Sequence, residues 1–242
     1  MGRAGESTRQ ACRRRTLARM GKPCEVKGCA KSVVHLSRYC GRHRQAAEQN
    51  GAPTASAIRK YQVRPYLKFV DRFVKANGHH VALLTVEGEL SCWLADAVSR
   101  TGGEVRWPTK PSDWRTKLDL ELLRLHRASV TGLNIFRTVA ALYLFAQYNP
   151  HALPPGDRVF WFACANHVLN LAPRYNAGNK SGRKGHRQRR VPAPLLENLG
   201  RDLTVRLHIV LRAMTTAIED AEQVRAERRR KLAAALAQHP FT

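Results

Sequence analysis

Apolar residues recur in steps of three and four near the end of the chain, and this spacing strongly constrains the fold. An α-helix turns once every 3.6 residues, so such steps gather the apolar side chains on one helical face. The pattern predicts one long helix over 195–237, or two helices joined near Gly200. The predicted apolar face consists of Leu195, Leu199, Leu203, Leu207, Val210, Met214, Ile218 and Ala221.

The middle of the chain also carries helical signals. Pro65 suits the first turn of a helix through YLKFVDRFVKA, and Gly78 suits the position after its end. Residues 81–100 fit either a strand over VALLTV or a helix over LSCWLADAVSR. Residues that commonly cap helix N-termini precede three later apolar stretches: Ser112 with Asp113, Thr131, and Asp157.

These signals predict a mainly α-helical protein in three parts. Residues 1–22 form a basic flexible arm, 23–46 a small metal-binding module, and 57–242 a helical domain. The segment NGAPTAS at 50–56 has the composition of a linker. The helical domain contains a basic loop at 174–190 and ends in the long helix. No apolar run reaches the roughly 18 residues that a membrane span needs, so no membrane partner is expected.

Three cysteines and one histidine lie in the pattern Cys24-x4-Cys29-x10-Cys40-x2-His43. Thiolate and imidazole are strong zinc ligands, and four of them complete a tetrahedral coordination sphere. Cys40 and His43 are three residues apart, which puts both on one face if a helix begins there. The spacing predicts a structural Zn²⁺ site formed by these four residues. His35 and Cys12 are alternative ligands.

The run CEVKGCAK followed by YCGRHR resembles the short Cys-x4-Cys…Cys-x2-His zinc modules of bacterial and phage proteins. Such modules often accompany HNH endonuclease domains or other DNA-binding domains. The resemblance covers residues 24–44. It implies zinc ligation by the same four residues. We expect a bacterial, phage or mobile-element protein. Because the N-terminus has no apolar signal-peptide core, we expect it in the reducing cytoplasm, and at the nucleoid if it binds DNA. An HNH core also needs a His, an Asn and a second His at short spacing, whereas here His79-His80 has no Asn before Asn134.

The net charge indicates the class of partner. Lys and Arg number 42 against 18 Asp and Glu, a formal net charge of +24. Residues 1–50 and 173–242 are more basic for their length than the middle of the chain. Positive charge gathered in this way is typical of proteins that bind nucleic acid. We therefore expect nucleic acid as the partner, with DNA favoured over RNA.

The predicted phosphate contacts fall in three basic groups. Arginine forms paired hydrogen bonds with phosphate, and the glycines of the 174–190 segment allow the main chain to approach a backbone closely. The predicted residues are Arg13, Arg14 and Arg15 in the arm, Arg38, Arg42 and Arg44 in the module, and Lys180, Arg183, Lys184, Arg187, Arg189 and Arg190 in the loop.

The main hypothesis is a zinc-containing DNA-binding protein, and two alternatives stay open. One is an RNA-binding or ribonucleoprotein-assembly subunit. The other is a metal-dependent, HNH-like nuclease with an unrecognised site, for which Asp71, Glu87, Glu89 and Asp96 are candidates. The chain contains no Walker loop, GxGxxG motif or nucleophile elbow, so no catalytic residue is predicted. The sequence does not indicate an oligomeric state.

Two further cysteines and one histidine are interpreted as parts of the core. Cys92 and Cys164 lie in the apolar contexts SCWLADAV and WFACANHVL. His167 lies close in sequence to Asn166 and Asn170. We interpret it as a buried histidine with a satisfied hydrogen bond rather than as part of a site.

Overall fold

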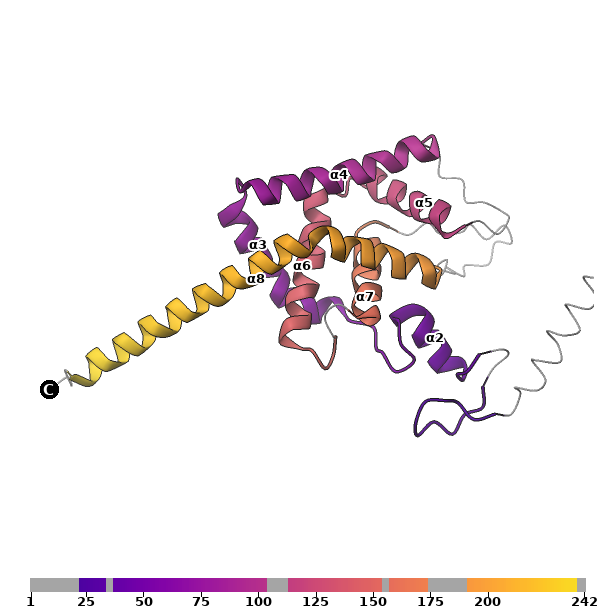
Figure 1. Cartoon of the computed structure of the whole chain (residues 1–242), viewed down its shortest axis with the longest axis horizontal. Coiled ribbons are helices and arrows are strands. Elements are labelled where there is room, and N and C mark those ends of the chain that lie inside the picture. The colour runs from indigo at the N-terminus through magenta and orange to yellow at the C-terminus, as the bar shows by residue number, and fades with distance from the viewer. Residues whose placement is uncertain (1–21, 34–36, 104–112, 154–156, 174–190, 239–242) are drawn as a thin grey trace, which may run out of the picture.

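The structure is a computed structural model that describes residues 22–33, 37–103, 113–153, 157–173 and 191–238. These residues form seven helices (Figure 1): α2 (Gly41–Asn50), α3 (Lys60–Asn77), α4 (Val81–Thr101), α5 (Trp114–Arg127), α6 (Gly132–Tyr148), α7 (Arg158–Leu169) and α8 (Ala193–Gln238). Within the described residues, β-type pairing is limited to one isolated bridge between Pro23 and Ser32. The prediction of a mainly α-helical fold is confirmed.

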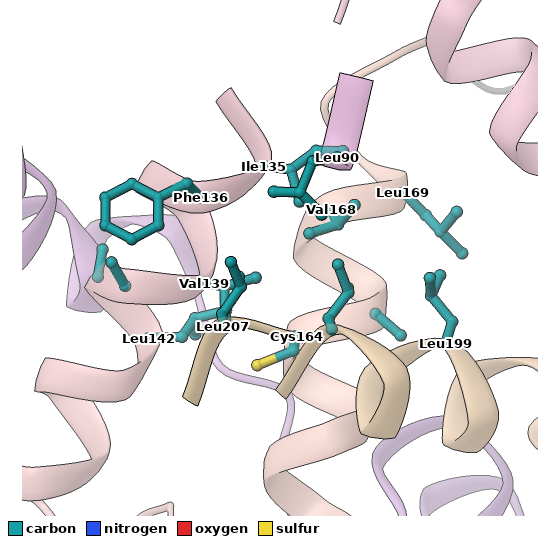
Figure 2. Close-up of a cluster of buried hydrophobic side chains, with 14 of the residues drawn as sticks. Leu90, Ile135, Phe136, Val139, Leu142, Cys164, Val168, Leu169, Leu199 and Leu207 are labelled. Carbon is teal, nitrogen blue, oxygen red and sulfur yellow. The ribbon is translucent and has the colours of Figure 1, made fainter. Parts of the chain in front are cut away.

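Helix α6 lies at the centre of the core, because α3, α4, α7 and α8 all pack against it. Its sequence GLNIFRTVAALYLFAQY is apolar on almost every side, as expected of a helix enclosed by others. Figure 2 shows part of the resulting cluster. The buried side chains labelled there are Leu90 of α4, Ile135, Phe136, Val139 and Leu142 of α6, Cys164, Val168 and Leu169 of α7, and Leu199 and Leu207 of α8.

The long C-terminal helix is confirmed, and it is a single helix rather than two. Helix α8 has 46 residues, which corresponds to a length of about 69 Å. The predicted apolar face is buried at intervals from Leu195 to Ile218, with Val210 partly buried. Beyond this face the helix leaves the body of the protein and projects from it, as Figure 1 shows in yellow.

For α4 the structure decides between the two alternatives left by the sequence, and for α3 it places the helix start earlier than predicted. Residues 81–101 are helical throughout, so the strand alternative is wrong. Helix α3 begins at Lys60, so Pro65 lies inside the helix rather than in its first turn, while Gly78 follows the end as predicted. Proline has no N–H to donate to the carbonyl of Tyr61. Tyr61 is 73% exposed, so water can reach this part of the helix and compensate for the missing bond.

Two of the predicted N-terminal caps form side-chain hydrogen bonds. The Thr131 hydroxyl accepts the N–H of Asn134 at 3.2 Å, and the Asp157 carboxylate accepts the N–H of Arg158 at 2.5 Å. Asp113 precedes α5 without a side-chain cap bond, and Ser112 lies outside the described residues.

The two cysteines assigned to the core have different positions. Cys164 is fully buried, and this burial raises the pKa of its thiol. Cys92 is exposed, so its assignment to the core is wrong. The buried face of α4 is formed by Leu83, Val86, Leu90, Leu94 and Ala97. Apolar neighbours in sequence do not determine which face of a helix a residue occupies, and Cys92 lies off the buried face.

A buried ion pair joins α5 to the end of α7. Arg124 is only 3% exposed, and its Nε donates to Glu121 Oε2 at 2.8 Å. Its two terminal nitrogens donate to three main-chain carbonyls at the end of α7 and just beyond it, at distances of 2.7–2.9 Å: Leu169, Ala172 and Pro173. A buried guanidinium is tolerated when its donors are satisfied in this way. Arg124 therefore holds the chain in place immediately before the basic segment 174–190.

Helices α7 and α8 cross so closely that only glycine fits between them. Gly200 is helical, and a Cβ atom added to it would overlap the main-chain carbonyl of Trp161. The absence of a side chain thus lets α8 lie directly on the backbone of α7. A contrasting helical glycine, Gly88 of α4, is exposed and has no atom within 4 Å of an added Cβ.

Alanine substitution at these two glycines should have opposite effects. Gly88→Ala should raise the free energy of unfolding by about 0.5–1 kcal/mol, because alanine is the better helix former. Gly200→Ala gains the same propensity but forces α7 and α8 apart, so it should lower the free energy of unfolding by about 1–3 kcal/mol. Chemical denaturation of both variants measures the difference. Equal stability of Gly200→Ala and the native chain would contradict the close crossing.

Candidate metal centre and nucleic-acid interface

Cys24 and Cys29, the first two predicted ligands, lie on a turn held by main-chain hydrogen bonds. The N–H of Cys29 donates to the carbonyl of Val26 at 3.1 Å, and Gly28 between them has φ +76°, which favours glycine. The N–H of Cys24 donates to the carbonyl of Lys31 at 3.0 Å. These bonds fold the segment back on itself and bring Cys24 and Cys29 to the same side.

The other two predicted ligands come from the start of α2. Cys40 is the residue before the helix, in an extended conformation, and His43 is the third residue of the helix. Their spacing brings Cys40 Sγ within 3.5 Å of His43 Nδ1. The helical arrangement expected for this pair is present.

The four side chains meet in one cluster. Cys24 Sγ lies 3.3 Å from His43 Nδ1, Cys29 Sγ lies 3.9 Å from Cys40 Sγ, and all four ligand atoms lie within 4.8 Å of one another. A disulfide has its sulfurs at about 2.05 Å, so these cysteines are unpaired thiols. The four residues are therefore positioned to bind a metal ion. Within the described residues, no other group of three or more His, Cys, Asp and Glu side chains converges in this way.

Main-chain donors influence the thiols of the cluster. The N–H of His43 lowers the pKa of Cys40, and this effect outweighs burial, which acts in the opposite direction. The N–H of Cys40 in turn donates to Cys24 Sγ at 3.3 Å. For Cys29, the N–H of Lys31 lowers the pKa, but burial and hydrogen bonds with Cys40 and Cys24 together raise it. At Cys40, the main-chain donor at the helix start thus lowers the pKa and favours the thiolate form, which is the form that binds metals.

The module contacts the helical domain through the end of α2. Asn166 of α7 donates its side-chain N–H to the carbonyl of Gln49 at 2.9 Å. Gly51 follows α2 with φ +87°, and a Cβ added to it would lie 2.9 Å from the carbonyl oxygen of Arg158. This contact requires glycine, because a side chain would collide with the α7 backbone. The position of α7 therefore determines the position of the Cys/His cluster relative to the helical domain.

Some of the predicted phosphate contacts lie beside this cluster. Arg42 is exposed and has no ion pair with any described residue. Arg38 lies 3.7 Å from Glu25, and Arg44 lies 3.7 Å from Glu48 on the next turn of α2. Both pairs are solvent-accessible and therefore contribute little energy. Arg13, Arg14 and Arg15, and the basic residues of 174–190, lie outside the described residues.

Helix α3 carries a basic face that the sequence analysis missed. Five exposed cations recur at steps of four, four, four and three, which places them within about 120° of the helix circumference. We call them the α3 stripe: Lys60, Arg64, Lys68, Arg72 and Lys75. The only acid of α3, Asp71, accepts a hydrogen bond from Arg137 Nε at 2.7 Å. The signal for this face in the sequence is the recurrence of a basic residue every three or four positions, which does not produce a contiguous basic run.

A polar pocket of about 540 Å³ lies between the end of α2, the segment 51–59, α7 and the start of α8. His167 lines this pocket and is only partly buried, and its Nε2 lies 3.1 Å from the carbonyl oxygen of Ile58. The predicted hydrogen bond is therefore present for one ring nitrogen, but the side chain is not fully buried as the sequence suggested. Burial lowers the pKa of His167, and the nearby Lys60 acts in the same direction. The neighbours considered in the sequence, Asn166 and Asn170, line the same pocket.

The residues considered for a nuclease site do not form a metal cluster in the described chain. Asp71 is paired with Arg137. His80 is the N-cap of α4, where its Nδ1 accepts the N–H of Ala82 at 3.2 Å. His80 thus serves the helix terminus in this structure.

Comparisons with known proteins gave no match, since no family model, curated protein or solved structure is significantly similar to the chain. Of the helices in the described ranges, none is by itself long and apolar enough to cross a membrane. Helices α5 and α6 satisfy that test only as a pair, bent by 110°.

Replacing one ligand should release the metal and disorder only the module. We expect Cys24→Ser to lose bound metal and to expose the amides near 24–46 to hydrogen exchange, while the core around α6 keeps its protection. The reason is that the module buries few apolar side chains of its own. Cys92→Ser, which changes an exposed cysteine of α4, is the control and should keep the native metal content. Equal metal content in both variants would remove Cys24 from the ligand set.

Proposed function

We propose that the cluster is a structural zinc site. With zinc–sulfur bonds of about 2.3 Å and zinc–nitrogen bonds of about 2.05 Å, tetrahedral geometry requires S···S near 3.8 Å and S···N near 3.6 Å. The observed distances are 3.9 Å for Cys29–Cys40, 3.5 Å for Cys40–His43 and 3.3 Å for Cys24–His43. Four protein ligands leave no coordination position for a substrate. The zinc ion would therefore hold the module together rather than take part in a reaction.

We further propose that the protein binds nucleic acid, and DNA in preference to RNA. The observation that carries this proposal is the α3 stripe, where five exposed cations share one helix face, and the single acid of α3, Asp71, is paired with Arg137. Charges of the same sign on one helix face repel one another, so they reduce the stability of the free protein. A polyanion would remove that repulsion, and none of the stripe cations has an ion pair with another described residue.

The dimensions of the stripe suit a nucleic-acid backbone. Fifteen steps along a helix from Lys60 to Lys75 span about 22 Å. Phosphates of one DNA strand follow each other every 3.4 Å along the axis, so the stripe runs past about six of them. Tyr61, which is 73% exposed, lies on the same side of the helix and offers a ring for contact with a sugar or base.

Other basic groups extend this surface in the proposal. Arg42 beside the metal cluster is available for a phosphate contact, because the described structure provides no acidic partner for it. The basic segment 174–190 and the arm contribute charge through Arg183, Arg187 and the other arginines and lysines predicted above. Such contacts position a protein on nucleic acid, whereas the choice of sequence would require contacts with base edges.

Binding to duplex DNA should therefore depend steeply on salt, and the α3 stripe should account for part of that dependence. If six to ten phosphates are neutralised, affinity should fall by roughly 10³–10⁵ between 50 and 200 mM salt. Replacing Arg64, Lys68 and Arg72 with glutamine keeps the helix propensity and should reduce the slope of log K against log salt by about 2–3. Fluorescence anisotropy across a salt series measures both quantities.

A charge-matched control separates the effect of the α3 stripe on DNA binding from the effect of the net charge of the protein. The control replaces three exposed arginines elsewhere, Arg115, Arg201 and Arg212, with glutamine. It should keep most of the native slope. Equal slopes for the stripe variant and the native protein would overturn the role of α3. Complete competition by structured RNA at matched charge would favour the ribonucleoprotein alternative, and cleavage of DNA upon addition of Mg²⁺ or Mn²⁺ would favour the nuclease.

The basic segment between α7 and α8 supplies an independent test. Replacing Arg183, Lys184, Arg187, Arg189 and Arg190 with alanine should weaken DNA binding and flatten the salt dependence, because fewer counterions are released. The same anisotropy series measures this. Native affinity and native slope in the variant would show that the segment does not contact the nucleic acid.

A further inference from the structure

The pocket beside α7 is lined by three kinds of side chain. Its lining consists of apolar side chains, uncharged polar side chains and the two cations Arg59 and Lys60. Its volume of about 540 Å³ lies within the range of small-molecule sites. The apolar lining is Ala57, Ile58, Val159, Ala163, Val191 and Leu196, and the polar lining is Gln49, Asn50, Ser56, Arg59, Lys60, Asn166, His167 and Asn170. No acidic side chain is found among these lining residues.

His167 and Asn170 each bring to this lining a hydrogen-bonding group without a partner among the described residues. A carbonyl can only accept, so His167 must donate its Nε2–H to Ile58, and its Nδ1 is then a bare acceptor in the neutral ring. Burial, which lowers the pKa of His167, keeps the ring neutral. The Asn170 side chain is exposed, and its amide offers both a donor and an acceptor. An imidazole acceptor and an amide can together hydrogen-bond a planar heterocycle that carries donors and acceptors on its edge.

The two cations of the pocket lie at the N-terminal end of the α3 stripe. Lys60 both lines the pocket and begins the stripe, and Arg59 precedes it. A strand that follows the stripe would therefore reach the pocket at the stripe's N-terminal end. Asn170 and Val191, on the other side of the pocket, flank the basic segment 174–190 in the sequence. Within the described residues, the positive charge of the pocket therefore comes from Arg59 and Lys60.

We propose that this pocket binds one unstacked nucleotide. The apolar side chains contact the faces of the base, Asn170 and His167 hydrogen-bond its edge, and Arg59 and Lys60 hold the adjoining phosphate. Proteins commonly read single-stranded bases in this way, by apolar contact and by hydrogen bonds to the base edge. For a nucleotide within a strand, the inference rests on the proposed nucleic-acid binding. The same chemistry would also accept a free nucleoside monophosphate, so the test must distinguish the two sources.

The first experiment uses the zinc-loaded, full-length protein and a single-stranded oligonucleotide with one fluorescent purine analogue and an end label. Anisotropy of the end label reports binding, and emission of the analogue reports its removal from the stack. Asn170→Ala should raise the Kd about tenfold, as expected for losing a paired contact to a base. Ala57→Trp, which fills the pocket from an exposed position, should abolish the emission change while the α3 stripe still supports weak binding. Ala95→Trp on the exposed side of α4 is the matched control and should behave as the native protein.

The second experiment adds free nucleoside monophosphates and follows the ring resonances of His167 by NMR, with His167→Gln to assign them. Shifts with free nucleotides but no binding of the oligonucleotide would support the pocket and overturn the proposed DNA binding. Native affinity and emission in both Asn170→Ala and Ala57→Trp would overturn the pocket and leave DNA binding intact. Binding of neither ligand to the native protein would overturn both proposals. Binding of the strand with loss of emission in the filled variant would establish the strand as the source.

Discussion

The close crossing of α7 and α8 at Gly200 is the contact on which the other features depend. Because α8 lies directly on the α7 backbone, α7 is held between α6 and α8 and its position is fixed. One end of α7 is joined to α5 through the buried Arg124, and its outer side receives the metal-binding module through Gln49 and Gly51. The same helix supplies Asn166 and His167 to the polar pocket. A small change in the crossing would therefore move the module and the pocket together.

Two different physical principles stabilise the two parts of the chain. The helical domain encloses α6 in apolar side chains from four other helices, so the hydrophobic effect suffices for its stability. In the described part of 22–50, by contrast, the buried apolar side chains are Cys24, Val33 and Cys40, and two of these belong to the ligand cluster. With so little apolar burial, metal binding at the proposed zinc site would supply the folding free energy of this segment. The short contact at Gly51 joins this segment to the helical domain.

The proposed functional surfaces, which are the metal-binding module, the polar pocket and the α3 stripe, adjoin one another in this order. The end of α2 leads from the metal cluster to the polar pocket, and the pocket leads through Lys60 to the α3 stripe. Each element contributes a different property in this proposal: the module a fixed shape and Arg42, the pocket a place for one base, and the stripe a row of charges for phosphates. Electrostatic attraction of this kind acts at long range and without sequence preference. Hydrogen bonds in the pocket act only on contact, so discrimination between nucleotides would arise there.

The sequence by itself determined the features that depend on neighbours along the chain. Helix periodicity predicted α8, and capping residue types predicted the caps at Thr131 and Asp157. Ligand spacing predicted that Cys24, Cys29, Cys40 and His43 would meet, because turns and helix starts are local structures. Tertiary structure alone decided which faces were buried and which residues came together from distant segments. Cys92 is exposed although its neighbours are apolar, and the pocket unites Gln49 with His167 across more than a hundred residues of sequence. Contacts between distant segments depend on the distance between packed helices. That distance is determined by residue pairs such as Gly200 and Trp161, and no local pattern of the sequence shows that these two residues are in contact.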